Sequence, residues 1–553
     1  MSQAFFSRHR LFLTPLSPIH LGCGEHYEPT NYVITDGVLY AFDPVQAELS
    51  PPQLSELWQA ARAGTIDRIQ RYFHTHAQTF VNSAYHAVAV SRALEKEYRE
   101  KAGKPANREA GDKTGANSLE IERTIANPQT HQPYIPGSAF KGCLRTTVLE
   151  RMVGGQIPQP KPSEREAARF EKDYLGSFAS DGFRLLKTAD FMPTAAVATQ
   201  IQYATNHKKA KIIQDGQMVK GKNVTGRRET IQHGQYRAFA ADCTIQHLLL
   251  AHRPPIRQPH KSLPQEHARP HSLQQLAQDA NRYHLHRFEQ ECALLEPRGL
   301  IDPDWLKHIR NLLAQLQPKL DQGSIMLLRL GKHGGAESKT IESLAQIKIM
   351  QGEGQKPTVE SKTTTVWLAA QAAKETHGLL PFGWVLVEID PQDDNTALKQ
   401  WCTDNGSHLP AIRQIHQRLA ERKARAAERK AALQAAARQA DQERIAKQRQ
   451  QAEEAARREA ELAAMAPAQR LAAVWMQKLK DFVYDDRNRS AHTQFYQSLL
   501  SALEQAATEL AREEQIQLAE LMSFKKMEKE KPSLFQGKRE KEIKAVLRRL
   551  RGE

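Results

Sequence analysis

An uninterrupted helical stretch near the C-terminus constrains the fold most. Residues 411–465 are dominated by Ala, Gln, Glu, Arg and Lys and contain neither Gly nor Pro. This composition predicts one long α-helix, which at 1.5 Å per residue would reach about 75 Å over about 50 residues. Such a helix is far longer than an average globular one. The chain is therefore expected to have one folded part before the helix and another after it.

The long helix carries only a thin apolar seam. Leu419, Ala426, Leu433 and Ala440 recur every seven residues, but half of these positions are Ala. The pattern favours a solvated single helix or a weak coiled coil over a tight zipper. Residues 467–553 then predict a small helical module that ends in the basic tail KREKEIKAVLRRLRG.

The part before the helix, residues 1–394, mixes strand and helix signals. LFLTPLSPIHLG and NYVITDGVLYAFD alternate as strands do, and the second predicts a hairpin that turns at Asp36-Gly37. Residues 53–100 and 247–320 predict helical insertions, whereas SIMLLRL and PFGWVLVEID predict strands. The expected fold class is therefore α+β.

The charge balance is basic. The chain has 78 Lys+Arg against 63 Asp+Glu, a formal net charge of +15. A polyanion is the partner that this suggests, with nucleic acid first and an acidic protein or an anionic membrane surface next, although the charge can also serve solubility alone.

The cysteines and the apolar runs bear on the compartment. The five cysteines are far apart and form no C-x-x-C, so neither a disulfide framework nor a structural zinc site is expected. No signal-peptide pattern or apolar run of membrane-spanning length is found, so the sequence predicts a cytoplasmic protein without a membrane partner.

Four short segments combine glycines with cations or with a histidine. They are SPIHLGCGE (17–25), IPGSAFKGCLRT (135–146), LRLGKHGGAESKT (328–340) and PFGW (381–384). The second predicts a helix that starts near Ser138, with Ser138 as its N-cap and with Lys141 and Arg145 on one face. Glycines beside cations let backbone amides and side chains approach phosphates together. Taken singly, each segment is also compatible with a structural turn or a solvated helix face.

Residues 206–237 form a basic segment. Eight Lys and Arg residues in it are accompanied by only Asp215 and Glu229, and DGQ and KGK supply turn glycines. The segment predicts a protruding β-hairpin, with a disordered basic loop as the alternative.

Together, the four segments resemble the RAMP superfamily of CRISPR effector subunits. Their order is most similar to the Csm-type subunit of type III-A complexes that caps the 3′ end of the guide RNA. The resemblance covers about residues 9–392 and leaves the long helix and the module after it without a counterpart. It implies a ferredoxin-like (RRM-like) core with insertions, in which residues 206–237 are a thumb-like hairpin against the guide–target duplex.

The resemblance also implies RNA-binding residues and partners. The expected partners are the guide crRNA, target RNA, the multicopy backbone subunit, the small subunit and trimming nucleases. The residues expected to bind RNA are His20, Gly22, Gly24, Gly137, Ser138, Lys141, Arg145, Lys208, Lys209, Lys211, Lys220, Lys222, Arg227, Arg228, Arg329, Gly331, Lys332, His333 and Lys339. For His20 a packed or turn-fixing role is the alternative.

No catalytic constellation is found in the sequence. The pairs His74–His76 and His284–His286 lack an H-E-x-x-H context, and Asp36 is explained by its tight turn. The expectation is a noncatalytic structural subunit without a cofactor or metal. The alternative function is a RAMP-type, metal-independent endoribonuclease that processes precursor crRNA with His20 as general acid/base. A third possibility gives the C-terminal part a role in protein interaction or oligomerisation.

Overall fold

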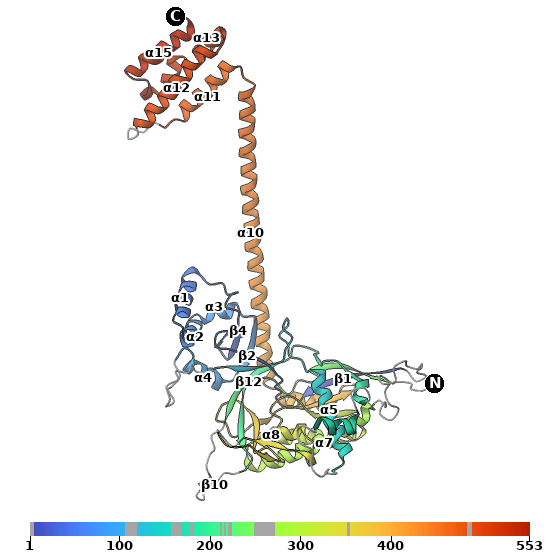
Figure 1. The fold of residues 1–553 in the computed structure, drawn as a ribbon. Helices are drawn as coiled ribbons and strands as arrows, with labels where there is room; N and C mark the ends of the chain where they lie inside the picture. Colours follow the sequence, from blue (N-terminus) through green and yellow to red (C-terminus); the bar gives the residue numbers. More distant parts are fainter. Residues whose placement is uncertain are drawn as a thin grey trace. The chain divides into compact units, whose positions relative to one another are not determined.

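The chain divides into two compact units, Met1–Arg425 and Ala426–Glu553 (Figure 1). The structure is a computed structural model. It describes residues 5–104, 119–155, 167–176, 181–210, 213–214, 217–218, 224–247, 271–350, 354–483 and 489–553. Each unit is described below by itself.

The first unit is built on a βαββαβ core. In chain order its elements are β1 (Phe6–Pro15), α5 (Gly137–Val153), β7 (Leu186–Thr188), β13 (Phe239–Gln246), α7 (Leu273–Leu295) and β19 (Trp384–Ile389). The strands lie in the order β7-β13-β1-β19, all antiparallel, and β14 (Ile325–Arg329) extends the sheet beyond β19. Numbered along the core, this order is 2-3-1-4. It confirms the α+β class and the ferredoxin-like core.

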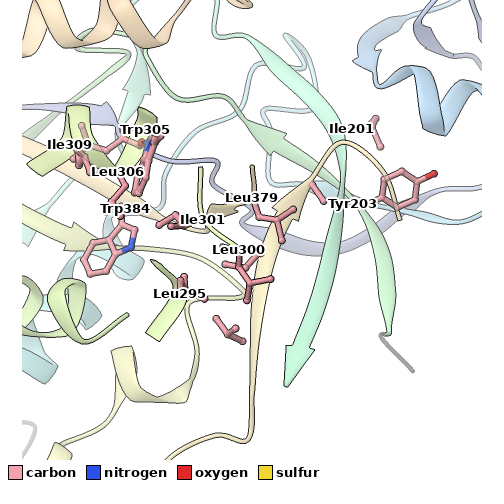
Figure 2. Close-up of a cluster of buried hydrophobic side chains, with 14 of the residues drawn as sticks. Ile201, Tyr203, Leu295, Leu300, Ile301, Trp305, Leu306, Ile309, Leu379 and Trp384 are labelled. Carbon is pink, nitrogen blue, oxygen red and sulfur yellow. The ribbon is translucent and has the colours of Figure 1, made fainter. Parts of the chain in front are cut away.

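Alternating residues on this sheet belong to two different hydrophobic clusters. On β14, Met326 and Leu328 belong to the cluster that also contains Phe140 and Leu144 of α5. Their neighbours on the same strand belong to a second cluster, which includes Trp384 and residues of α8 (Pro303–Gln322). Figure 2 shows this second cluster, with Trp305, Leu306 and Ile309 of α8 close to Trp384. The sheet is thus buried on both faces, which fixes the strand ends from which the motif loops start.

A second, nine-stranded sheet completes the first unit. Its main path is β2-β6-β12-β9-β5-β4-β3, and β17 pairs with both β9 and β18. The strand bounds are β2 (Gly22–Tyr27), β3 (Tyr32–Thr35), β4 (Val38–Ala41), β5 (His86–Val90), β6 (Ile121–Thr124), β9 (Thr199–Lys208), β12 (Thr225–Ile231), β17 (Thr365–Ala370) and β18 (Leu380–Pro381). The expected hairpin at Asp36-Gly37 is present as β3 and β4, and both turn residues have positive φ.

The region 53–100 departs from the expected helices. It contains α1 (Pro51–Arg62), α2 (Ile66–Thr75), α3 (Ala77–Asn82) and α4 (Arg92–Lys101), but β5 lies between α3 and α4. The helical interpretation around Val88 was therefore wrong. All five residues of β5 are buried, so the strand lacks the apolar–polar alternation that would have marked it.

The basic segment 206–237 overlaps the end of β9 and contains all of β12. These two strands pair antiparallel, and the short strands β10 (Ile213–Gln214) and β11 (Gln217–Met218) pair between them. Three predicted RNA-binding residues, Lys211, Lys220 and Lys222, lie outside the described residues. The other strands and α-helices described before α10 are α6 (Ala167–Leu175), β8 (Met192–Pro193), β15 (Ile347–Ile349), β16 (Thr358–Glu360) and α9 (Thr396–Asn405).

The long helix is α10 (Leu409–Ala463), and its start belongs to the first unit. Leu409, Ile412 and Leu419 are buried there, so this unit continues to Arg425, beyond the expected boundary at residue 394. From residue 426 to 461 the side chains of α10 are exposed. No helix among the described residues is long and apolar enough to cross a membrane.

The second unit has its own hydrophobic core. After the end of α10 it contains α11 (Pro467–Asp481), α12 (Arg489–Glu509), α13 (Arg512–Leu521), α14 (Phe524–Glu530) and α15 (Lys538–Arg551). Their buried residues, Trp475, Leu503 and Leu547 among them, form one cluster. The helical module expected after residue 467 is thus a packed bundle.

Candidate nucleic-acid interface

The helix α5 begins within the sequence Pro136-Gly137-Ser138, but not at the predicted residue. Pro136 is the N-cap and Gly137 the first helical residue, so the prediction that Ser138 caps the helix was wrong. A Cβ at Gly137 would lie 2.6 Å from the carbonyl oxygen of Ala189, and the Gly137 amide donates to Asp190 Oδ1 at 2.8 Å. Gly137 therefore serves close packing, and its amide already has an acceptor.

A cleft of about 520 Å³ lies beside the first turns of α5. Three of the four motif segments line it. The lining residues are Leu21, Gly22, Ile125, Pro136, Ser138, Ala139, Gly142, Cys143, Thr146, Arg329, Leu330, Gly331, Lys332, Ser338 and Lys339. They include three cations and no carboxylate, and the positive end of the α5 dipole is adjacent. This combination suits an anion such as a phosphate.

The loop after β14 is held against the segment after β1. Gly331 has φ +87°, and a Cβ there would lie 2.5 Å from the carbonyl oxygen of His20. The Lys332 amide donates to that same oxygen at 2.8 Å. Glycine is thus needed at 331 for both conformation and space. As a result, the Lys332 side chain stands at the edge of the cleft, where it is half exposed.

His20 lies beneath this surface rather than on it. Its side chain is fully buried, with Nδ1 2.8 Å from the Glu229 carbonyl oxygen and Nε2 3.3 Å from Glu122 Oε2. Burial lowers the pKa of His20, and the hydrogen bond to Glu229 opposes this only in part. A buried, doubly engaged imidazole cannot meet a substrate at the surface, so the geometry gives no support to a general acid/base role.

Glu122 of β6 forms ion pairs with two cations, Lys332 and Arg228, next to the cleft. Its carboxylate accepts from Lys332 Nζ at 2.8 Å and lies 3.1 Å from Arg228 Nη2. Burial raises the pKa of Glu122, but the hydrogen bond from Lys332 and the charge of Arg228 outweigh burial and bring the pKa to about 2. Glu122 is therefore ionised and occupies the place next to these cations that a phosphate would take.

Lys141 and Arg145 do not line the cleft. Lys141 Nζ donates to the Leu186 carbonyl at 2.9 Å, and burial lowers its pKa. Arg145 forms ion pairs with Asp181 and, at 3.2 Å, with Glu171. Both predicted phosphate ligands are thus engaged with the chain's own acceptors.

Other predicted cations also have carboxylate partners. Arg227 is 2.6 Å from Glu97, Lys209 is 2.6 Å from Glu337, and the buried Arg329 is 2.8 Å from Glu291.

The remaining predicted residues do not join the cleft either. The His333 ring packs on Trp367 and Phe382, and burial lowers its pKa to about 3. Lys208 and Gly24 are exposed. Of the predicted set, Gly22, Ser138, Arg329, Gly331, Lys332 and Lys339 line the cleft.

Some residues of the site were missed in the sequence. Gly142 and Thr146 line the cleft four and eight positions after Ser138. The i, i+4 spacing on α5 could have identified them. The acids Glu97, Glu122 and Glu337 were missed as well, because they are between 106 and 210 residues away in the sequence from the predicted cations that they hold.

The histidine pairs do not build a metal centre. His76 lies 2.9 Å from Glu56, and His286 lies 3.7 Å from Glu342. His284 is fully buried with Nε2 3.1 Å from the Cys143 sulfur. Among the described residues no group of three or more His, Cys, Asp or Glu is arranged to hold a metal ion.

The family comparison covers the part of the chain that supplies the first two motif segments. Residues 12–238 match the family model of the RAMP superfamily. This segment is similar to the RAMP superfamily. It contains the end of β1 and all of α5 and β7 of the ferredoxin-like core, and it stops just before β13. No curated protein matches the chain by sequence.

Two solved structures are similar to the chain at low identity. One is a chain of the "Cryo-EM structure of Csm-crRNA-target RNA ternary complex in type III-A CRISPR-Cas system". It is 16% identical with a TM-score of 0.40, and the match covers 69% of this chain and 100% of that one. The other is the crystal structure of T. onnurineus Csm5, 15% identical with a TM-score of 0.38, covering 68% of this chain and 99% of that one.

Proposed function

We propose that this chain is a noncatalytic, RNA-binding subunit of a cytoplasmic type III-A CRISPR ribonucleoprotein. In this role it caps the 3′ end of the crRNA and terminates the backbone filament, next to the multicopy backbone subunit and the small subunit. It supports crRNA maturation and antiviral defence by setting guide length together with trimming nucleases.

The carboxylate-free cleft is the observation that carries the RNA-binding part of the proposal. Lys332 and Lys339 line it with exposed side chains, and a Cβ at Gly142 would meet nothing within 4 Å, so the backbone there is open to a close approach. A lining of glycines, cations and a helix N-terminus selects for phosphate and sugar rather than for a base sequence. A guide-binding subunit has this requirement, since guides differ in sequence.

The specific place at the 3′ end rests on the motif resemblance within the RAMP superfamily. The paired strands β10 and β11 are in the position of the proposed thumb-like hairpin. The hairpin would wedge against the guide–target duplex.

The test of the cleft is a charge reversal at its edge. In Lys332→Glu/Lys339→Glu, RNA binding should weaken by at least tenfold near 0.1 M salt. For single-stranded RNA the slope of log affinity against log salt should fall by about 1.4, because each lost phosphate contact is worth about 0.7. The matched control is Lys430→Glu/Arg438→Glu on the exposed part of α10, with the same change in net charge.

The assembly role is tested by co-purification. The tagged wild-type chain should bring down the backbone subunit and guide RNA of uniform length, and the cleft variant should lose the guide. Guide-loaded complexes of normal composition from the cleft variant would refute the site.

Incubation with repeat RNA in EDTA tests the alternative function, that of an endoribonuclease. Cleavage that disappears in His20→Ala would replace the structural role by an endoribonuclease.

A further inference from the structure

Positive charge in the second unit is concentrated at its C-terminal end. Residues 525–551 contain eleven Lys and Arg against four Glu. The stretch of α10 from 426 to 463, in contrast, contains eight Lys and Arg against seven Asp and Glu. Composition alone therefore separates α14 and α15 from the rest of this unit.

The outward face of α15 carries most of this charge. Ile543, Val546, Leu547 and Leu550 bury the inner face in the core of the bundle. The exposed cations on the other side of the helix are Lys538, Lys541, Lys544, Arg548, Arg549 and Arg551. Helical spacing places them on one continuous face, with the half-buried Glu540 and Glu542 at its margins.

Pairing within the helix leaves half of these cations available. Glu540 lies 2.5 Å from Lys544, and Glu542 lies 3.7 Å from Lys538. Lys541, Arg548 and Arg549 form no ion pair with the described residues of the chain. They are thus free to meet an external anion.

Helix stability does not account for this arrangement. Cations in the last turn stabilise a helix through its dipole, which explains Arg548, Arg549 and Arg551. Lys538 and Lys541 lie in the first turn, where the same dipole disfavours positive charge. A face that is basic over its whole length, including the end where this costs stability, indicates an external partner.

The chemistry of the face selects the partner. A basic amphipathic helix binds a membrane through its apolar side, but here that side is buried in the bundle. A protein interface needs an apolar centre, whereas the large exposed hydrophobics of this unit (Leu433, Ile445, Met465, Val483, Ile516 and Leu521) lie on other segments. We propose that the outward face of α15 is a second RNA-binding surface that contacts the phosphate backbone without sequence preference.

This proposal does not depend on the cleft, and the test keeps the two apart. Lys541→Gln/Arg548→Gln/Arg549→Gln is introduced into the full chain that already carries Lys332→Glu/Lys339→Glu. The matched control in the same background is Arg429→Gln/Lys430→Gln/Arg438→Gln, three exposed cations of α10. Binding of a single-stranded RNA is followed by fluorescence anisotropy between about 50 and 200 mM salt.

The α15 variant should lose about 2 units of salt slope, since three phosphate contacts at about 0.7 each are removed. It should also bind at least tenfold more weakly at the lower salt, and the α10 control should not change. Equal binding by the two variants overturns the proposal. If the cleft proposal fails, its background variant binds RNA as the wild type does, and the comparison at α15 remains valid.

Two further measurements test whether the variant has lost its fold and whether the surface binds another class of partner. Arg548→Lys/Arg549→Lys preserves charge and should preserve affinity, which separates loss of charge from loss of fold. Polyglutamate and vesicles containing phosphatidylserine are tested alongside RNA. If the α15 variant loses binding to either of these while its RNA binding is unchanged, the surface belongs to an acidic protein or a membrane and the proposal is wrong.

Discussion

Glu122→Gln separates the two roles that the structure gives to one carboxylate. Glu122 stabilises the fold by holding Lys332 at 2.8 Å and Arg228 at 3.1 Å. The same charge repels a phosphate that approaches those cations. Because glutamine keeps the shape and removes the charge, we expect the variant to be less stable and to bind RNA more tightly.

The loss of stability follows from the pKa of Glu122, which is about 2 in the fold against an ordinary value of 4.5. A difference of that size corresponds to about 3 kcal/mol of unfolding free energy at pH 7 as an upper value. Since the folded pKa is the lower one, this contribution is complete above the unfolded pKa of 4.5 and is lost as the pH falls towards 2. Urea unfolding at pH 7 should therefore show the full deficit, and the deficit should shrink below pH 4.5.

The gain in RNA binding follows from Coulomb's law. Removing one negative charge about 6 Å from a bound phosphate, at an effective dielectric constant of about 60, is worth about 0.9 kcal/mol. That is roughly a fivefold increase in affinity. The increase should diminish at high salt, because the edge of the cleft is partly exposed.

Glu97→Gln is the matched control. Glu97 also has a pKa of about 2 and holds Arg227 at 2.6 Å, but neither residue lines the cleft. It should lose a similar amount of stability without any gain in RNA affinity. If Glu122→Gln binds RNA no more tightly than the wild type, or if both variants change RNA binding equally, the competition between Glu122 and phosphate is refuted.

The remaining predictions concern stability. Gly137→Ala should lower Tm because its Cβ would lie 2.6 Å from a carbonyl oxygen, whereas Gly142→Ala, with open space around its Cβ, should raise stability by about 0.5–1 kcal/mol. A chain ending at residue 425 should keep the first unit's Tm, but one ending at 405 should lower it by several degrees, because it loses the buried apolar side chains at the start of α10. Arg145→Glu should lower Tm because it places a third carboxylate beside two others. Differential scanning calorimetry measures Tm for each of these variants, and an unchanged Tm would contradict each expected loss.

The sequence was informative wherever the signal was local. The turn at Asp36-Gly37, the strand that leads to Arg329 and the long helix all depend on neighbouring residues, and the structure has them near the expected positions. β5 was missed because it is buried on both faces, and periodicity cannot distinguish such a strand from a buried helix. The end of the first unit was placed too early because burial at Leu409 is not visible in a helix-forming sequence.

The candidate site was predictable only in part, for a different reason. The motif segments come together in the fold, since Gly22, Ser138 and Lys332 line one cleft. The sequence could not reveal which cations were already neutralised. Arg227 has few acids near it in the chain but is paired with Glu97 in the fold. A local excess of positive charge thus overestimates the surface available to RNA.

Whether a cation is already paired with a carboxylate determines how readily it can bind a phosphate. If a phosphate took Arg227 from Glu97, a carboxylate that is mostly buried would be left without its main partner. Leaving a buried charge unpaired costs several kcal/mol, more than an exposed phosphate contact returns. Lys339 is exposed and lines the cleft, so a phosphate can bind it without such a loss. RNA should therefore bind first at Lys339, and charge reversal there should weaken binding more than the same change at Arg227 does at equal stability.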